Sequence, residues 1–215
     1  MNSLKYWLLL LILFTSCGNQ ETFQILNLDT AKKMIQNYYE SGQFDKECAE
    51  AINVGIAEIE KLKLSKNSAV VFDIDETVLS NYEHTKELGF GYVYELYEKW
   101  LRQGNAKAIP ETKRFYNWLV QKNIKVIFLT GRHAEDLAST KKNLLAEGFT
   151  NFDTLIVRSA RNKKIAAAEW KALERERLTK NGYVIIACIG DQWSDMVGGF
   201  TGIKIKLPNY LYIIE

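Results

Sequence analysis

Two aspartates at the end of a short apolar run constrain the fold of this chain more than any other feature. The run Ala-Val-Val-Phe, residues 69–72, is followed at once by Asp73, Ile74 and Asp75. Residues i and i+2 of a strand point the same way, so both carboxylates can face one site while Ile74 turns into the core. Two negative charges this close repel, which raises a pKa unless a cation lies between them. The pattern predicts a buried strand, 69–73, that ends at a metal site or at a nucleophile beside a partner acid.

The acidic pair alone is ambiguous, because such pairs also cap a following helix, and on its own it indicates either role equally. The longer pattern Asp-x-Asp-x-Thr directly after a strand is more specific. Thr77 completes this pattern, and its hydroxyl can orient Asp75.

Two further apolar runs also end in polar residues. The run 124–129 leads into Thr130-Gly131-Arg132, where a hydroxyl and free backbone N–H groups at a helix start near Ala134 would form an anion site. A plain strand–turn–helix with a polar cap explains this segment equally well. The run 183–189 leads into Gly190-Asp191. The carboxyl ends of parallel strands meet at one edge of a sheet, so the sequence predicts that Asp73, Thr130 and Asp191 converge there.

The order of apolar and amphipathic segments predicts an α/β domain, with a five-stranded, mostly parallel sheet covered by helices on both faces. The length of 215 residues suits one such domain. The alternating residues of Ile203–Leu207 are typical of a half-covered edge strand. Strands are expected at 69–73, 124–129, 154–157, 183–189 and 203–207, and helices at 29–62 (capped by Asp29 or Thr30), 92–102, 110–121, 134–147 and 163–180.

An aromatic-rich insert, residues 80–110, follows the first strand and is expected to form a small helical cap. Most of its rings are expected to pack the cap against the main domain, with Tyr82 and Tyr92 as the exceptions that would stack on a substrate. His84 is expected at the surface, with a ligand-contacting or proton-carrying role as the alternative. With only two histidines in the chain, a His-rich metal site is not expected.

The first residues have the pattern of an export signal. Lys5 precedes the apolar run 6–14, which spans about 14 Å as a helix, too short for a bilayer core of about 30 Å. The cysteine in Leu-Phe-Thr-Ser-Cys resembles the lipidated cysteine of bacterial lipoproteins, which predicts a signal peptide over 1–16, a lipid anchor on Cys17 and a tether over 17–28. An ordinary signal peptide with an incidental cysteine is the alternative. The predicted product is an exported, membrane-anchored protein, in the outer membrane or on the periplasmic face.

The remaining cysteines and the overall charge narrow the possible partners. Cys188 lies in an apolar run and is expected to be a small buried side chain, so a disulfide with Cys48 is the less favoured alternative. A net charge of +2 and the lack of a basic aromatic face predict no nucleic-acid partner. The sequence leaves the oligomeric state open.

The motifs FDIDET, FLTGR and GDQWSD, in this order with a lysine between the last two, resemble the haloacid dehalogenase (HAD) superfamily of phosphatases. The resemblance is greatest to its class B/C acid phosphatases, which include bacterial lipoprotein acid phosphatases and plant acid phosphatases with the vegetative storage proteins. It extends from about residue 70 to the end, through KNLLAEGF and the tail KLPNYLY. It implies a Rossmann-like three-layer αβα sandwich, from 29 to 215, with a cap after the first strand.

The resemblance also implies roles for individual residues. Asp73 would be the nucleophile that forms an aspartyl-phosphate, and Asp75 the acid for the leaving alcohol and then the base for water. Phosphate would be bound by Thr130, by the Gly131 backbone and by Lys171, with Lys163 and Lys164 as alternatives. Mg²⁺ would be bound by the Asp73 carboxylate, the Asp75 backbone carbonyl and Asp191, with Asp195 in support. These oxygen ligands suit Mg²⁺, and the cations suit the negative charge of a phosphoryl group in transfer.

The expected function is a Mg²⁺-dependent phosphomonoesterase acting on small phosphate monoesters, with nucleoside 5′-monophosphates as candidate substrates. A non-catalytic lipoprotein that binds phosphorylated ligands or serves storage is the alternative from another class. Some relatives of this group have lost the nucleophile, whereas Asp73 is present here. Phosphotransfer to an alcohol would use the same residues and also stays open.

Overall fold

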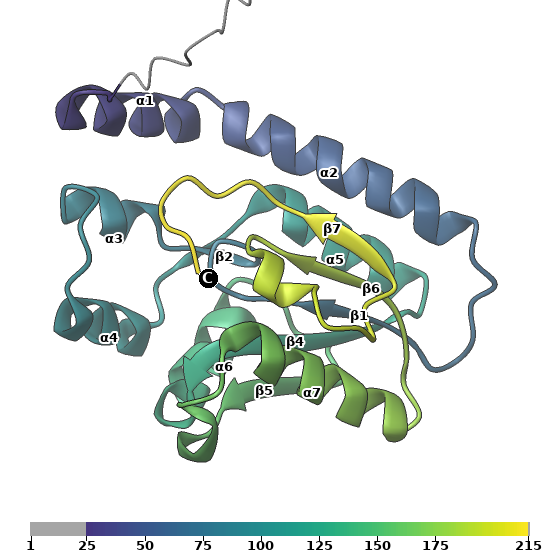
Figure 1. The fold of residues 1–215 in the computed structure, drawn as a ribbon. Helices are drawn as coiled ribbons and strands as arrows, with labels where there is room; N and C mark the ends of the chain where they lie inside the picture. Colours follow the sequence, from purple (N-terminus) through teal and green to yellow (C-terminus); the bar gives the residue numbers. More distant parts are fainter. Residues whose placement is uncertain (1–24, 215) are drawn as a thin grey trace, which may run out of the picture.

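The computed structural model describes residues 25–214, and a five-stranded parallel sheet forms the centre of this part of the chain (Figure 1). The strand order is β5-β4-β1-β6-β7, and every neighbouring pair is parallel. The predicted α/β fold is confirmed, and β7 lies at an edge as expected. The strands are β1 (Ser68–Phe72), β4 (Lys125–His133), β5 (Thr154–Arg158), β6 (Val184–Gly190) and β7 (Ile203–Lys206).

Alternation along β1 explains why the sheet is covered on both faces. Val70 and Phe72 belong to one apolar core with side chains of α2 (Gln43–Glu60) and α5 (Pro110–Gln121). Ala69 and Val71 face the other way, into a second core with α7 (Ala167–Lys180). In Figure 1, α2 lies above the sheet and α7 below it. A strand buried on both sides is apolar at every position, which is why residues 69–72 show no polar alternation.

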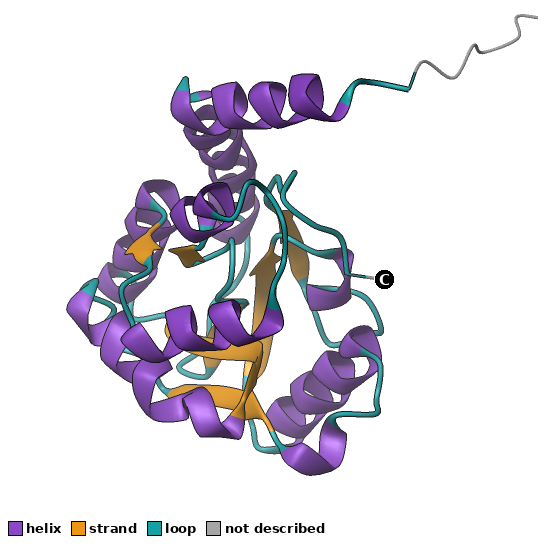
Figure 2. Cartoon of the chain, turned by 90° about the vertical axis from the view of Figure 1, so that its left-hand side faces the viewer, coloured by secondary structure: helices purple, strands orange, loops and turns teal. Residues whose placement is uncertain are grey.

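The N-terminal helix is two helices, and the prediction of a single helix over 29–62 was wrong. α1 (Leu28–Glu40) is capped by the Asn27 side chain, which accepts the Asp29 and Thr30 N–H groups. Gly42, with φ of +83°, separates α1 from α2, because glycine adopts this left-handed conformation without a steric penalty. α1 projects from the main body in Figure 2.

The insert after β1 forms the expected cap. It contains β2 (Leu79–Ser80), α3 (Tyr82–Glu87), α4 (Tyr94–Gln103) and β3 (Lys107–Ala108), and β2 pairs with β3 in a separate two-stranded sheet. The Pro110 start of α5 is as predicted.

Two helix starts differ from the prediction. β4 continues to His133, and α6 (Leu137–Ala146) starts only after a short 3₁₀ helix, Ala134–Asp136. A second 3₁₀ helix, Ala160–Asn162, likewise precedes α7. The Thr130-Gly131-Arg132 segment therefore belongs to β4, at an irregularity where the pairing with β5 is interrupted between Leu129 and His133, and the expected turn into a helix lies later in the chain.

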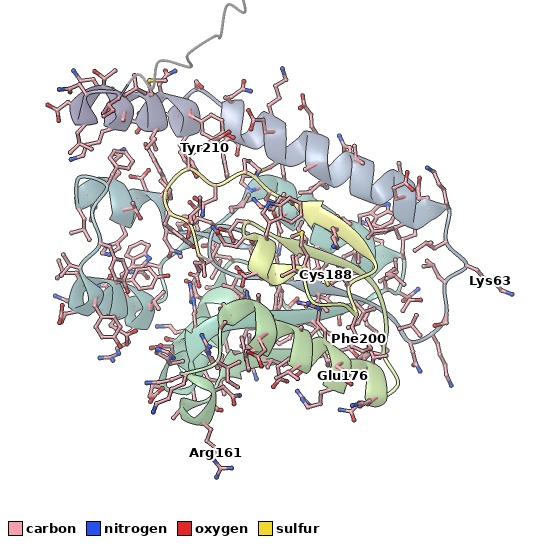
Figure 3. All side chains as sticks on the ribbon, viewed as in Figure 1. Lys63, Arg161, Glu176, Cys188, Phe200 and Tyr210 are labelled. Atoms are coloured by element: carbon pink, nitrogen blue, oxygen red, sulfur yellow. The ribbon has the colours of Figure 1, made fainter. Side chains whose placement is uncertain are left out.

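The last residues return across the domain to the joint between α1 and α2. Tyr210 packs edge-on against Tyr38 of α1, with ring centroids 4.8 Å apart, and lies under this joint in Figure 3. Cys48 and Cys188 are both buried with free thiols, as expected. Among residues 25–214, no helix has the length and apolar character to cross a bilayer. The predicted signal peptide and Cys17 lie outside the described residues.

Candidate active site

A cavity of about 510 Å³ lies where the predicted polar strand ends converge. Asp73 follows β1, Gly131 and Arg132 belong to β4, and Asp191 follows β6. These three strands are neighbours in the sheet, so their carboxyl ends meet at one place. The cap and the C-terminal tail complete the wall.

Asp73 and Lys171 form the centre of the site. Lys171, on α7, places its Nζ 2.6 Å from Asp73 Oδ1 and 2.5 Å from Asp195 Oδ1. All three side chains are more than 90% buried. The structure therefore brings Lys171 to Asp73, whereas Lys163 and Lys164 are exposed ahead of α7.

Three carboxylates gather beside this lysine. Oxygens of Asp73, Asp191 and Asp195 lie within 4.8 Å of one another, and all three residues are buried. Burial and the neighbouring carboxylates raise the pKa of Asp73 well above its usual range, although Lys171 opposes this shift. Burial and Asp195 raise the pKa of Asp191 to about 6.

The donor set fits a divalent metal ion. With all three carboxylates ionised, the single ammonium would leave two uncompensated negative charges, and this buried excess is what raises the pKa of Asp73 and Asp191 when no cation is bound. The donors are all oxygen atoms, which hard cations prefer. Asp195 contributes a carboxylate to this group directly, where the sequence suggested only a supporting role.

The Asp191 side chain is fixed by three neighbours. Thr77 donates from its hydroxyl to Oδ1 at 3.2 Å and accepts the Asp191 N–H at 3.0 Å. Gln192 and Asn209 donate to Oδ2 at 2.7 and 2.6 Å. Thr77 thus orients Asp191, and the prediction that it orients Asp75 was wrong. The reason is that the chain turns sharply after Asp75, with Glu76 at φ of 52°.

The GDQWSD segment is held tightly against the sheet. The Gln192 N–H donates to Asp195 Oδ2 at 2.9 Å. A side chain at Gly190 would overlap the Asp195 carboxylate, so glycine is required for this close approach. The buried Arg175 donates to the Asp195 carbonyl oxygen at 2.8 Å. These contacts place Asp191 and Asp195 on the same side of the cavity as Lys171.

Asp75 lies in a different environment from Asp73. Arg132 Nη2 donates to Asp75 Oδ1 at 2.7 Å, and its Nε donates to both oxygens. Asn81 and Tyr97 add hydrogen bonds to Oδ1 at 2.8 and 3.2 Å. Burial would raise the pKa of Asp75, but the charge and hydrogen bonds of Arg132 outweigh it and hold this pKa below its usual value. The structure therefore stabilises Asp75 as a carboxylate.

A further buried acid, Glu76, joins the cavity to the tail. Its carboxylate accepts the Asn81 N–H at 2.6 Å and the Tyr212 hydroxyl at 2.8 Å. Burial and the nearby Asp75 and Asp191 raise the pKa of Glu76 to about 8. No periodic pattern in the sequence indicates this contact, because it joins residues 136 positions apart.

Thr130 and Gly131 differ in their access to the cavity. Gly131 lines it, and a side chain at this position would meet open space. Thr130 is fully buried, and its hydroxyl oxygen accepts the Arg132 N–H at 3.2 Å. Arg132, the third residue of the predicted motif, is the one that reaches into the site.

The cap aromatics divide into packing and cavity-lining groups. Tyr82 stacks on Tyr39 of α1 and donates to Glu40 at 2.8 Å, so the prediction that it faces a substrate was wrong. Tyr92 is 69% exposed and lines the cavity. His84 is buried and stacks on Trp100, which corrects its expected surface position. The other cap aromatics on the cavity wall are Phe90, Tyr94 and Tyr97.

This geometry agrees with the comparison against known families. Residues 11–215 match the family described as HAD superfamily, subfamily IIIB (Acid phosphatase). The chain belongs to this family. The match confirms the resemblance inferred from the motifs and assigns the observed sheet and cap to a HAD-like fold.

Individual relatives support the same assignment. The chain is 41% identical over 160 residues to the stem 28 kDa glycoprotein of Glycine max, covering 72% of this chain and 63% of that protein. It is 32% identical to acid phosphatase 1 of Solanum lycopersicum, in a match that covers 67% of this chain and 58% of that protein. The matches therefore span less than two thirds of the length of these relatives. The structure of the class C acid phosphatase from Bacillus anthracis has the same fold, with a TM-score of 0.71, 22% identity and 86% of each chain covered.

Proposed function

We propose that this HAD-family chain hydrolyses small phosphate monoesters through a phosphorylated Asp73. The observation that carries the proposal is the buried Asp73 carboxylate at the cavity, 2.6 Å from Lys171 and beside two further carboxylates. Binding alone does not need a nucleophile, and unless a metal ion is held beside it an anionic oxygen at this position repels a phosphate ligand. A carboxylate that attacks phosphorus, in contrast, has to lie beside the bound phosphate group.

The proposed reaction has two steps. An Asp73 oxygen attacks phosphorus, the bond from phosphorus to the ester oxygen breaks, and the leaving alkoxide takes a proton from Asp75. Water then attacks the aspartyl-phosphate, Asp75 takes the proton of this water, and inorganic phosphate and free Asp73 result. The first step needs protonated Asp75, so the Arg132 contact must weaken when substrate binds.

The remaining residues stabilise charge. The Lys171 ammonium faces the oxygens of the phosphoryl group, where negative charge is spread during transfer. Burial would lower the pKa of Lys171, but Asp73 and Asp195 outweigh it and keep this side chain charged. The Gly131 backbone completes the proposed phosphate site, and Thr130, which does not line the cavity, would act on it through its hydrogen bond with the Arg132 N–H.

Asp73, Asp191 and Asp195 would hold Mg²⁺, together with the Asp75 backbone carbonyl. An ion bound to these oxygens would neutralise negative charge on the phosphoryl group. It would thereby allow the Asp73 carboxylate to approach the phosphorus. Thr77, Gln192 and Asn209 keep the Asp191 oxygens in place for this role.

Nucleoside 5′-monophosphates are the proposed substrates among the phosphate esters. The aromatic rings of the cap on the cavity wall, with Tyr92 the most exposed, offer faces on which a base can stack. Phosphotransfer to an alcohol in place of water is compatible with the same residues.

The test is phosphate release from 4-nitrophenyl phosphate and from a nucleoside monophosphate, with Mg²⁺ and with EDTA, on protein starting after Cys17. We expect release that EDTA abolishes and that added Mg²⁺ restores, and none from Asp73→Asn protein. A higher rate with the nucleotide would support base stacking. Absence of release from folded wild-type protein would favour the binding or storage function instead.

We also propose that the chain is exported and anchored to a membrane through a lipid on Cys17. The support is the apolar run 6–14 and the Leu-Phe-Thr-Ser-Cys sequence after it. Mass spectrometry of the N-terminal peptide from protein made in bacteria, with Cys17→Ser as the control, tests this proposal. An unmodified Cys17 in membrane-free fractions would contradict it.

A further inference from the structure

Asp136 is a buried acid on the cavity wall that the proposed chemistry does not use. It is 0% exposed and lines the cavity. Both of its carboxylate oxygens lack a hydrogen-bond partner among residues 25–214. A buried carboxylate without partners is costly, so its environment is complete only when something else donates to it.

The position of Asp136 at the start of a helix does not explain why its carboxylate is buried without a hydrogen-bond partner among the described residues. It precedes α6, where an aspartate normally accepts N–H groups of the first helical turn, yet its side chain makes no such bond. Ser139 donates to the Asp136 backbone carbonyl and leaves the carboxylate untouched. Arg102 Nε lies 4.0 Å from Oδ1, beyond hydrogen-bond distance, and its side chain is 65% exposed beside Glu98.

The same cavity contains other unsatisfied groups. His133 Nδ1, three residues before Asp136, and His84 Nε2, on the cap, are both buried without a hydrogen-bond partner in the described part of the chain. Both residues line the cavity. An imidazole nitrogen donates or accepts according to its tautomer, whereas a carboxylate only accepts. Within the segment that the structure describes, the cavity wall therefore carries three side chains with unpartnered polar atoms that the proposed phosphate chemistry does not use.

We propose that Asp136 binds hydroxyl groups of the leaving alcohol of the substrate, with His133 and His84 as further contacts, so that the enzyme selects polyhydroxylated, sugar-like phosphate esters. This proposal rests on the proposed phosphatase function and adds the chemistry of the leaving group. Hydroxyls donate to a carboxylate and also accept from an imidazole, so they satisfy both kinds of group. A site built to bind a hydroxyl rejects an analogue that lacks it, because its buried groups are then left unpaired.

The surroundings favour a neutral ligand over an ammonium group. Arg102 lies near Asp136, and Arg132 is bonded to Thr140, which follows Asp136 by about one helical turn. The Arg102 charge would oppose an ammonium at Asp136, whereas the Arg132 charge is already paired with Asp75. The volume of about 510 Å³ is enough for a phosphate together with a group the size of a sugar.

The test compares two esters that differ only in hydroxyl groups: ribose 5-phosphate and tetrahydrofurfuryl phosphate, which has the same ring without hydroxyls. For wild-type full chain we expect kcat/KM to favour ribose 5-phosphate by about tenfold or more. In Asp136→Asn and Asp136→Ala this preference should fall toward one, while turnover of the hydroxyl-free ester is retained. Glu135→Gln removes the neighbouring exposed acid and should keep the wild-type preference.

Two results would overturn the proposal. One is a wild-type enzyme that hydrolyses both esters equally. The other is a pair of Asp136 variants that lose activity on both esters in the same proportion, which would mean that Asp136 only supports the fold or binds water. The preference is a ratio within one protein, so partial misfolding does not mimic a specific loss.

A binding measurement separates this proposal from the proposed function. Calorimetry with Asp73→Asn protein compares ribose 5-phosphate with inorganic phosphate, and then repeats both with Asp136→Asn added. The hydroxyl site is supported if adding Asp136→Asn weakens the binding of ribose 5-phosphate by about tenfold and leaves the binding of inorganic phosphate unchanged. This result would support the site even if wild-type protein hydrolyses neither ester. Equal affinities for both ligands in both proteins would overturn it.

Discussion

Asp73 and Asp75 are two residues apart in sequence, yet the structure gives them opposite electrostatic environments. Asp73 lies beside one lysine and two carboxylates, and its pKa is raised. Asp75 is bound by a buried arginine and two neutral donors, and its pKa is lowered. One carboxylate lies in a site with surplus negative charge, which suits a metal ion, and the other is already paired within the protein.

The two environments are also built from different parts of the chain. The contacts of Asp73 come from strand ends and α7 of the main domain. Those of Asp75 come partly from the cap, through Asn81 and Tyr97, and partly from Arg132 of β4. The sheet thus positions the proposed nucleophile, whereas the cap helps to set the protonation state of the proposed acid. If Asp75 is the acid for the leaving group, changes in the cap should alter leaving-group chemistry while leaving the contacts of Asp73 and Lys171 intact.

The largest expected effect is that of Asp73→Asn. The amide keeps the shape of the side chain but cannot form the phosphorylated intermediate, so kcat should fall by about 10⁴-fold or more for every ester. The measurement is turnover of aryl phosphates over a range of leaving groups. Asp153→Asn changes a surface acid that is paired with Lys125 and serves as the control. Near-normal turnover by the Asp73 variant would contradict the mechanism.

A smaller and selective effect is expected from Asp75→Asn. Loss of a positioned acid costs about 10²- to 10⁴-fold, and the cost depends on how much the leaving group needs a proton. Turnover of esters with good leaving groups should survive slowly, while alkyl esters should become inert. The slope of rate against leaving-group pKa should steepen relative to wild type. A uniform loss over all esters would show that the two aspartates do not have distinct roles.

The sequence was sufficient to predict which residues gather around Asp73, and it was insufficient to predict which residues bind Asp75. Asp73, Lys171 and Asp191 follow local patterns, namely apolar runs with polar ends and motifs of fixed order, and a parallel sheet brings such ends together. The bonds from Arg132 to Asp75 and from Tyr212 to Glu76 join residues 57 and 136 positions apart. No local period specifies these pairs, because they depend on how the cap and tail fold back over the sheet. For the same reason Thr77 was assigned to the wrong aspartate.

The helices and strands also divide into those that local sequence patterns predict and those that depend on the rest of the fold. The runs 69–72 and 124–129 predicted their strands to within a few residues, because burial on both faces leaves a continuous apolar sequence. The break between α1 and α2 was missed, since the apolar spacing continues across Ser41 and Gly42 and only the backbone conformation of Gly42 ends the helix. His84 was placed at the surface because a single histidine in a polar segment gives no sign of the Trp100 ring that covers it.

Arg132→Gln tests whether the charge of Arg132 causes the lowered pKa of Asp75. The variant should change the pH dependence of the reaction more than its maximal rate. Glutamine keeps a hydrogen-bond donor but removes the positive charge. Burial then dominates, so the pKa of Asp75 should rise, by about one to three units. The limb of the kcat/KM profile that reports Asp75 should move to higher pH by this amount, whether Asp75 is needed as acid or as base. Arg114→Gln, an exposed arginine on α5, should leave the profile unchanged. A lower rate with unshifted limbs would mean that Arg132 only supports the structure, and that the contrast between the two aspartates does not arise from its charge.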